Sequence, residues 1–425
     1  MVMATATVMG NPPKPPRPLP DIVAVPVPVT PLRLAVTASL TLVLAGLAGA
    51  NALDALVTPA NPALALSVRP GSARAMSRDA EFSLAKALSD KRDYAVAERK
   101  ALRAVAASPA NPRALQVLGL AAQQRNDTAA AGRYMTLSSQ LSRRNGLVQI
   151  WLVDQAARAG RSAEALAHFD ITMRASPAFS AQLYPILANA LQSREIRDAF
   201  RPYIKGNPSW LAPFLGFAAD QSPNPADVSK AIVEAGGMPQ GKEFRGTTAL
   251  LLDKLSATGK FADMARFYRS ARRGADTGAM TSLSVDRAGT DPDFTPMTWK
   301  PVDSGDVQVS PVAAEQKGRF GLRFEAFDTR GAEAARKYLF LEPGAYRIAH
   351  RAVALGEGGG RLQLALACPG ANGLLARLDL RAGEGTKRIV VPAGCTTQLA
   401  VLAVTDATGD DGLDLALTLL DIAPG

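Results

Sequence analysis

The stretch "NPRALQVLGLAAQQRNDTAAAGRYMTLSSQLSRR" (residues 111–144) is one period of a pattern that recurs along the middle of the chain. Its Ala131 has counterparts 34 residues away on both sides, at Ala97 and Ala165. Three apolar pairs recur at the same interval: Leu84-Ala85, Leu118-Gly119 and Leu152-Val153. Pro109 and Pro177 are separated by twice that interval. A fixed period of this length predicts stacked helical hairpins, each too small to bury its apolar face alone.

The repeated residues have simple physical roles in such a stack. Small side chains at Ala97, Ala131 and Ala165 let two helices approach closely, and the bulky Phe169 follows Ala165 by four residues. Pro109 and Pro177 end helices, because proline lacks the backbone donor and clashes with the preceding turn. This pattern resembles the tetratricopeptide repeat, which implies a helical solenoid with a partner-binding concave face.

The period weakens after Ser180, although helical patterning continues. We expect degenerate helical units to about Ala279, so that the repeat region spans residues 78–280. Expected helices are Gln182–Ala190, Glu195–Ile204, Pro225–Glu234 and Thr247–Ser256, and the segment "GKFADMARFYRSARRG" (Gly259–Gly274) is typical of a repeat's second helix.

Near the N-terminus, residues Leu34–Leu53 contain no charge, and Arg33 precedes them. Twenty apolar residues suffice to cross a bilayer, and the preceding basic residues place the N-terminus in the cytoplasm. The segment is longer than a usual signal-peptide core, yet Ala48-Gly49-Ala50 would suit a signal peptidase. We therefore predict a transmembrane helix at 32–57, with a cleaved export signal as the alternative. A disordered proline-rich tail (1–31) precedes it and a linker (58–77) follows.

Beyond about Phe294 the pattern changes to short alternating runs separated by Gly, Pro and Asp. Such runs predict an antiparallel β-sandwich at 290–425, with jelly-roll topology as one arrangement. The ten expected strands are Met297–Val302, Val307–Val309, Phe320–Phe324, Lys337–Leu341, Ala345–Val353, Leu362–Ala367, Leu374–Leu380, Arg388–Val391, Gln398–Val404 and Leu413–Leu420. The segments "GEGGG" (Gly356–Gly360) and "TGDDG" (Thr408–Gly412) are expected to be hairpin turns.

The chain's two cysteines, Cys368 and Cys395, are 27 residues apart in this domain. In an oxidising compartment they should form a disulfide, and in the cytoplasm they would be two buried thiols. Export through the apolar segment favours the disulfide. Two cysteines without a nearby histidine fall short of the four ligands of a structural zinc site.

The 425 residues are 47% hydrophobic and 20% charged, which suffices for folded cores. Residues 58–280 hold 30 Lys/Arg and 18 Asp/Glu, so the net charge of +10 is concentrated there. This excess would attract an acidic polysaccharide or simply solvate a helical surface. Nucleic acid is not an expected partner, because an exported chain rarely meets it.

No catalytic constellation or cofactor motif stands out, so we expect a non-enzymatic protein without a cofactor. His168 and His350 lie far apart, and His168 is expected to be structural. The cluster Asp406, Asp410, Asp411 and Asp414 lacks the spacing of a calcium loop, which favours a solvated turn. Trp299 and Tyr346 are candidate contacts to a glycan, with core packing as the more frequent role of such residues.

Two longer segments narrow the prediction. "LSRRNGLVQIWLVDQAARAGRSAEALAHFD" (Leu141–Asp170) and "FLEPGAYRI…LQLALACPG…VPAGCTTQLAVLAV" resemble bacterial envelope tetratricopeptide proteins associated with exopolysaccharide biosynthesis. The resemblance implies an inner-membrane protein with its bulk in the periplasm, and envelope proteins of polysaccharide assembly as partners. Two hypotheses follow: an anchored scaffold that binds proteins through its repeats, or a glycan-binding, less plausibly glycan-modifying, protein that acts through the sandwich.

Overall fold

The computed structural model describes residues 31–90, 94–272, 277–287, 289–302, 305–313, 320–370, 373–407 and 412–425. Helices occupy the first part and two antiparallel sheets the second, so the predicted order of α then β is confirmed. The expected tail lies outside the described residues except for Pro31. Two compact units divide at Pro109, inside the predicted repeat region, rather than between helices and sandwich.

The first unit contains four helices, of which the first is strongly apolar. Residues Ala35–Val57 of this helix form a 23-residue segment with a mean hydropathy of 1.8, long enough to cross a membrane. A signal sequence would have the same properties. The helices are α1 (Pro31–Val57), α2 (Pro62–Val68), α3 (Ala73–Ser89) and α4 (Ala95–Ala107).

The predicted linker 58–77 is itself structured. Asn61 caps α2 by accepting a hydrogen bond from the Leu64 amide, and Ser72 caps α3 in the same way at Ala75. These side chains satisfy amide donors that a helix start leaves without a partner. Pro62 occupies the first position of α2, where proline suits a helix start. The segment predicted as a linker therefore contains a short helix.

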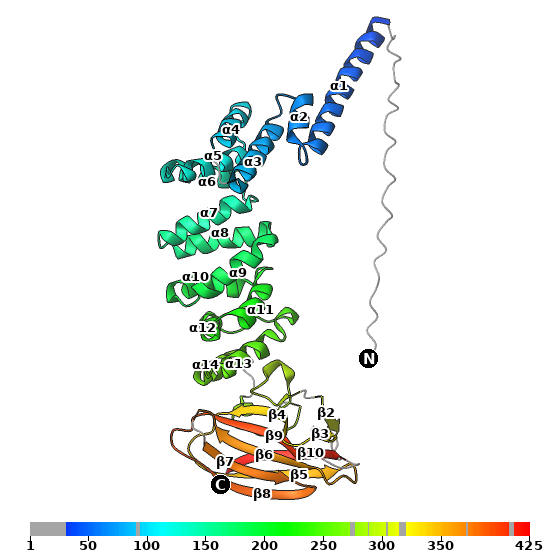
Figure 1. Ribbon diagram of the computed structural model, residues 1–425, viewed down its shortest axis with the longest axis vertical. Coiled ribbons are helices and arrows are strands. Elements are labelled where there is room, and N and C mark those ends of the chain that lie inside the picture. The colour runs from blue at the N-terminus through cyan, green and yellow to red at the C-terminus, as the bar shows by residue number, and fades with distance from the viewer. Residues whose placement is uncertain are drawn as a thin grey trace, which may run out of the picture. The chain divides into compact units, whose positions relative to one another are not determined.

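The second unit begins with ten helices that stack in successive pairs (Figure 1). In its last three pairs, α10 and α12 pack against one another in one layer, and α9 and α11 in the other. The helices are α5 (Pro112–Gln124), α6 (Thr128–Leu141), α7 (Gly146–Arg158), α8 (Ser162–Ala175), α9 (Ser180–Ala190), α10 (Arg194–Gly206), α11 (Leu211–Gln221), α12 (Pro225–Ala235), α13 (Thr247–Ala257) and α14 (Phe261–Ala271).

Small residues set the spacing of the first two pairs. Ala131 on α6 and Ala165 on α8 are buried. Gly119 on α5 faces Met135, and an added Cβ there would lie 2.9 Å from the methionine's methyl carbon. Two helix starts also repeat at the 34-residue interval, because Asn111 caps α5 and Asn145 caps α7. Ala97, the first alanine of the series, is buried on α4 of the other unit.

The later pairs are held together by aromatic side chains. Phe200 on α10 is fully buried, and its ring centroid lies 5.5 Å from that of Phe214 and 6.2 Å from that of Trp210. Phe169 on α8 meets Trp210 edge to face at 5.3 Å. Edge-to-face pairs contribute roughly 0.5–1.5 kcal/mol beyond the area that they bury. Helix α11, which carries Phe214, was not among the helices expected from the sequence.

The sandwich consists of two five-stranded antiparallel sheets with strand orders β1-β4-β9-β6-β7 and β2-β3-β10-β5-β8. Most connections cross between the sheets, as in a jelly roll. The strands are β1 (Lys300–Pro301), β2 (Val307–Ala313), β3 (Phe320–Ala326), β4 (Ala332–Leu339), β5 (Gly344–Ala354), β6 (Arg361–Cys368), β7 (Gly373–Leu380), β8 (Gly383–Val391), β9 (Gln398–Asp406) and β10 (Leu413–Pro424).

The predicted glycine-rich turn Gly356–Gly360 joins strands of different sheets, so it is not a hairpin: residues 355–360 lead from β5 to β6. The other predicted turn, Thr408–Gly412, lies outside the described residues except for Gly412. Position 360 needs a glycine because the backbone there lies close to Gly412: an added Cβ would be 2.8 Å from the Gly412 carbonyl oxygen. The sequence showed the turn chemistry without showing which strands the turn connects.

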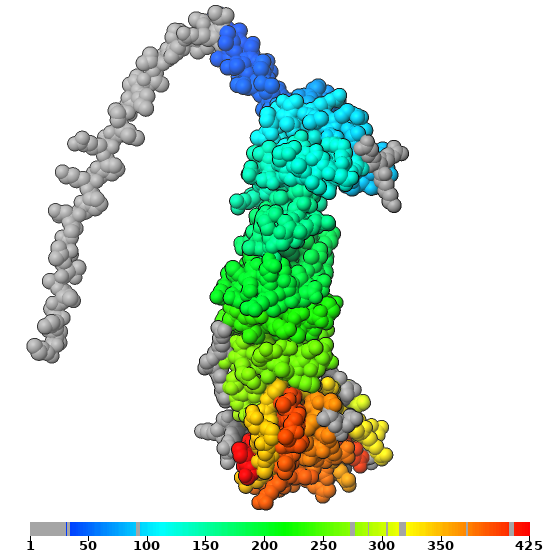
Figure 2. Space-filling model, turned by 90° about the vertical axis from the view of Figure 1, so that its left-hand side faces the viewer, coloured from blue at the N-terminus to red at the C-terminus, as the bar shows by residue number. Residues whose placement is uncertain are grey.

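The helical stack and the sandwich share one apolar core. Tyr338 on β4 packs against Phe261 on α14 with ring centroids 5.4 Å apart, and Met280 and Met297 belong to the same cluster. The surface accordingly runs without interruption from the last helical pair onto the sandwich (Figure 2). The predicted boundary between residues 280 and 290 therefore marks a change of secondary structure inside one compact unit.

Candidate binding surfaces

The two helix layers at the end of the stack differ in charge. Helices α9 and α11 contain 22 residues, of which Asp220 alone is charged, whereas α10 and α12 contain nine charged residues among 24. The side chain of Ile186 on α9 is 62% exposed, and Pro185 and Pro213 are exposed beside it. One layer therefore presents an uncharged, partly apolar surface, which we call the α9–α11 face.

The opposite layer pairs most of its charges within itself. Arg197 on α10 binds Glu234 on α12 at 3.0 Å, and Arg201 binds Asp198 at 2.8 Å within α10. The Arg201–Asp198 pair is exposed and of a kind that contributes little to stability, roughly 0–1 kcal/mol, whereas the Arg197 side chain is only 10% exposed. The charged layer thus differs from the α9–α11 face in its surface chemistry.

A polar network accompanies the apolar contacts between the first two pairs. The Gln149 amide donates to Ser139 Oγ at 2.9 Å, and its oxygen lies 2.7 Å from His168 Nδ1. Asn145 donates to Gln116 at 2.6 Å in the same region. Burial lowers the pKa of His168, opposed by the charge of Glu164. This histidine is thus part of the packing between helices, in agreement with its expected structural role.

Two neighbouring hollows flank the loop between α12 and α13. One of about 440 Å³ and one of about 350 Å³ share Pro239 and Gln240 as their common wall. Phe244, which is buried, anchors this loop in the core. Together the hollows form a groove, which we call the Gln240 groove.

The Gln240 groove carries more positive than negative charge. Lys205, Lys242 and Arg245 line it, and none of their side chains has an ion pair or hydrogen bond with any residue in the described part of the chain. Asp293 also lines the groove, while Glu243 lies over Gly241 and accepts a hydrogen bond from Asn207. The available cations suit an anionic group on a polymer.

A third hollow of about 510 Å³ lies where the helices meet the sandwich. Arg269 on α14 and Glu342 in the β4–β5 loop supply its charges, and Phe340 and Met280 its apolar wall. Arg269 and Ala271 line different hollows although they are two residues apart on one helix. Hollows therefore lie on both sides of α14, near the point where the chain passes into the sandwich.

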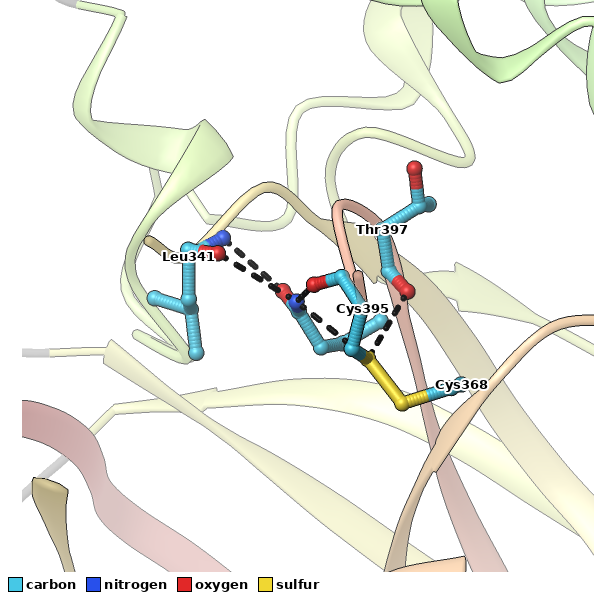
Figure 3. Close-up of a disulfide and its surroundings, with 5 residues drawn as sticks. Leu341, Cys368, Cys395 and Thr397 are labelled. Carbon is cyan, nitrogen blue, oxygen red and sulfur yellow. Dashed lines mark hydrogen bonds between the residues drawn. A yellow bond between two sulfur atoms is a disulfide. The ribbon is translucent and has the colours of Figure 1, made fainter. Parts of the chain in front are cut away.

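The disulfide between Cys368 and Cys395 is present, with Cα atoms 5.7 Å apart (Figure 3). It joins the end of β6 to the segment before β9. Buried Gln398 donates to the Cys395 carbonyl at 2.6 Å and accepts from the Leu341 amide at 2.8 Å. The pair thus supports the wall of the third hollow, to which Leu341 and Thr396 belong. Gln398 was not singled out in the sequence, since a buried glutamine has no signature of its own.

The two aromatic candidates for glycan contact have different environments. Trp299 is 1% exposed, and its indole nitrogen donates to the Leu283 carbonyl at 3.0 Å, so it cannot serve as a surface stacking platform in this structure. Tyr346 is half-buried against the sandwich core, and its hydroxyl donates to the Glu342 carbonyl. The burial of Trp299 supports a role in core packing.

Two titratable side chains are buried in the sandwich. Lys337 alternates along β4 with the core residues Ala335 and Leu339, and its Nζ has no hydrogen-bond partner among the described residues. Burial lowers the pKa of Lys337 to about 7, although the charge of Asp286 opposes the shift. Burial also lowers the pKa of His350, whose ring occupies space left by Gly385 on β8. Sequence patterning did not indicate that either residue faces inward.

The aspartate cluster does not form a metal site within the described residues. Asp414 accepts two hydrogen bonds of 2.7 Å from Arg323, which lower the pKa of its carboxyl group. Asp410 and Asp411 lie outside the described residues. No group of three or more potential metal ligands occurs in the part of the chain that the structure describes.

Neither a protein-family model nor a curated protein matches the chain. Solved carbohydrate-binding modules are among the structures that match part of the chain. One is TmCBM61 in complex with beta-1,4-galactotriose, at 14% identity over 31% of this chain and 90% of that one, with a TM-score of 0.22. Another is CBM6cm-2 from Cellvibrio mixtus lichenase 5A with cellotriose, at 13% identity over 34% and 98%, with a TM-score of 0.22. A CBM4 structure matches at 11% identity over 35% and 99%, with a TM-score of 0.25.

Proposed function

We propose that this protein is a membrane-tethered adaptor that binds a partner protein outside the cytoplasm through the α9–α11 face. The observation that carries the proposal is that two adjacent helices, α9 and α11, hold a single charged residue, whereas their neighbours in the other layer hold nine. Apolar surface that remains exposed is typical of interaction sites. Burying the α9–α11 face would cost little, because Asp220 is its single charge.

The tether is supported by the contacts around the candidate cleavage site. Ala50 and Asn51 lie within the continuous helix α1. The Asn51 amide donates to the Leu47 carbonyl at 2.9 Å, on the other side of the bond that a signal peptidase would cut. Its oxygen accepts from Arg69 in the folded segment that follows. A retained helix keeps both of these bonds, whereas cleavage after Ala50 would remove the bond to Leu47.

Site-specific photo-crosslinking tests the adaptor role. A photoreactive amino acid at position 186 should give one discrete adduct in intact cells, and the same group at position 201 on α10 should give none. Ile186→Glu, introduced beside a photoreactive group at position 182, should abolish the adduct. No adduct at 186, or equal adducts at 186 and 201, would contradict the proposed partner surface.

A second candidate function is binding of an acidic polysaccharide in the Gln240 groove, favoured by its three available cations. The full-length protein in detergent should migrate more slowly in a gel that contains the producing cell's acidic polysaccharide than in a gel without it. Lys242→Glu and Arg245→Glu should weaken this retardation, whereas Arg388→Glu on strand β8 should not. Equal effects of the three variants would indicate non-specific charge attraction instead.

The cellular setting follows from the resemblance noted in the sequence. We infer an inner-membrane protein with a cytoplasmic N-terminus, whose partners are envelope proteins of polysaccharide assembly. The disulfide supports an oxidising compartment for the sandwich, because such bonds persist outside the cytoplasm. If a deletion strain makes normal polysaccharide, the proposed link to polysaccharide assembly is wrong. The tether and the partner surface are tested separately.

A further inference from the structure

The chain that follows α1 turns back along it. The Asp54 carboxylate accepts hydrogen bonds of 2.9 Å from Thr58 and from Ser72, the residue that caps α3. One turn earlier, Asn51 accepts from Arg69. Residues 69 and 72 therefore lie beside residues 51 and 54, which places the intervening helix α2 next to the last two turns of α1.

The last turns of α1 lie at the boundary between hydrocarbon and headgroups when α1 spans a membrane. The 23-residue apolar segment is about 34 Å long at 1.5 Å per residue, which exceeds the roughly 30 Å of hydrocarbon by less than one helical turn. Asn51 and Asp54 are polar and occur at its far end, so this is the end that leaves the hydrocarbon. Helix α2 accompanies it and shares that level.

Helix α2 exposes an apolar face at this level. Leu64 and Val68 lie four residues apart, hence on one side of the helix, and are 51% and 47% exposed. Ala65 and Pro62 are buried. A short helix that exposes about half of each of two neighbouring large apolar side chains is poorly suited to an aqueous setting. Beside a membrane span, the same side chains can enter the boundary between headgroups and acyl chains.

A hollow of about 470 Å³ with two cationic residues adjoins this face. Its lining consists of Asn51, Asp54, Arg69, Gly71, Ser72, Ala73 and Arg74. The Asp54 carboxylate is engaged by two hydroxyl groups, and Arg74 has no ion pair with any residue in the described ranges. The available positive charge is complementary to a phosphate group.

We propose that the segment 62–74 docks onto the bilayer surface, with Leu64 and Val68 in the acyl boundary and Arg69 and Arg74 at phospholipid phosphates. This inference rests on the proposed tether, since α1 must be in the membrane to bring α2 to it. The consequence is mechanical: the first folded helices are held against the membrane at two points instead of following the span on a free linker. A juxtamembrane basic residue contributes about 1 kcal/mol at an anionic surface.

Spin labels at single introduced cysteines test this docking, because the two native cysteines are bonded to each other. The full chain carrying Leu64→Cys, Val68→Cys or, as a control, Leu102→Cys on α4 is labelled. It is then reconstituted into phosphatidylethanolamine vesicles that contain phosphatidylglycerol. Leu102 is 50% exposed and thus matches the exposure of the test positions. Labels at 64 and 68 should collide preferentially with oxygen, and the label at 102 with a water-soluble nickel chelate.

The outcomes separate the docking from the tether. If the protein floats with the vesicles and labels 64 and 68 behave like label 102, the docking is wrong and the tether stands. If the protein does not float, both are wrong. Arg74→Gln should reduce the docked population at label 64 about fivefold in anionic vesicles. Arg99→Gln, an exposed control on α4, should leave it unchanged, and equal effects of the two variants would overturn the phosphate contact.

Discussion

The first two helical pairs of the second unit, α5–α8, and the later helices, α9–α14, solve the same packing problem with different side chains. The first section brings helices together over Ala131, Gly119 and Ala165, in small apolar clusters with a polar network beside them. The second spaces its helices with Phe200, Trp210 and Phe214. Close approach needs a small residue at a fixed position, whereas a wider gap can be filled from several positions. This difference explains why the 34-residue period is visible in the first section and fades in the second.

The largest expected effect is in the aromatic section. Phe200→Ala removes a fully buried ring that contacts Trp210 and Phe214, and should cost about 3–5 kcal/mol. The chain's three tryptophans permit a regional measurement, since Trp151 lies in α7, Trp210 precedes α11 and Trp299 lies in the sandwich. In single-tryptophan versions of the Phe200→Ala variant, Trp210 should become exposed to solvent at a lower urea concentration than Trp151. Simultaneous exposure of both would show that the two sections unfold as one.

Lys337→Met tests whether the sandwich is coupled to the aromatic section that it adjoins. Burial lowers the pKa of Lys337 to about 7 in the folded state, below its ordinary value of 10.5. The unfolded chain therefore binds the proton more tightly, and stability rises with pH between 7 and 10.5. From pH 7 to 9 the wild-type free energy of unfolding should rise by about 2 kcal/mol more than that of the variant. Urea midpoints monitored at Trp210 and Trp299 should both show this. A change confined to Trp299 would contradict the shared core.

Ala131→Leu tests close packing in the first section. Ala131 is fully buried and lies in a cluster with Ala122 and Trp151. Extra methyl groups at such a site typically cost about 1–3 kcal/mol. The loss should appear as earlier exposure of Trp151 in urea, while Ala157→Leu on the exposed side of α7 leaves the midpoint unchanged. Equal midpoints for the two variants would show that this section tolerates bulk and that the small residue is not required.

The smallest effect on stability is expected from Ile186→Glu on the α9–α11 face. Exposed substitutions usually change the free energy of unfolding by less than about 0.5 kcal/mol. The urea midpoint at Trp210 should therefore stay within this limit even though the crosslinked adduct is lost. A large loss of stability would show that Ile186 is a packing residue and would remove it from the partner surface.

Sequence reasoning located the elements better than their interactions. Alternation and turn residues indicated all ten strands, and helix patterning indicated α9, α10, α12 and α13, because these signals are local. Helix α11, "LAPFLGFAADQ", was missed, although its apolar periodicity is no weaker than that of α9 and α13. The burial of Trp299 and Lys337 depends on which strands pair, and no local pattern encodes this. The repeated caps Asn111 and Asn145 were visible at the 34-residue spacing and would have strengthened the prediction of repeats.

The tether is the claim on which both the partner surface and the membrane docking depend in the cell. The N-terminal sequence of the mature protein, purified from membranes after detergent extraction, tests it most directly. The account predicts a chain that begins upstream of Ala35 and therefore retains the whole of α1. A mature chain that begins at Asn51 or Leu53 would show that the apolar segment is removed, and would contradict the tethered adaptor.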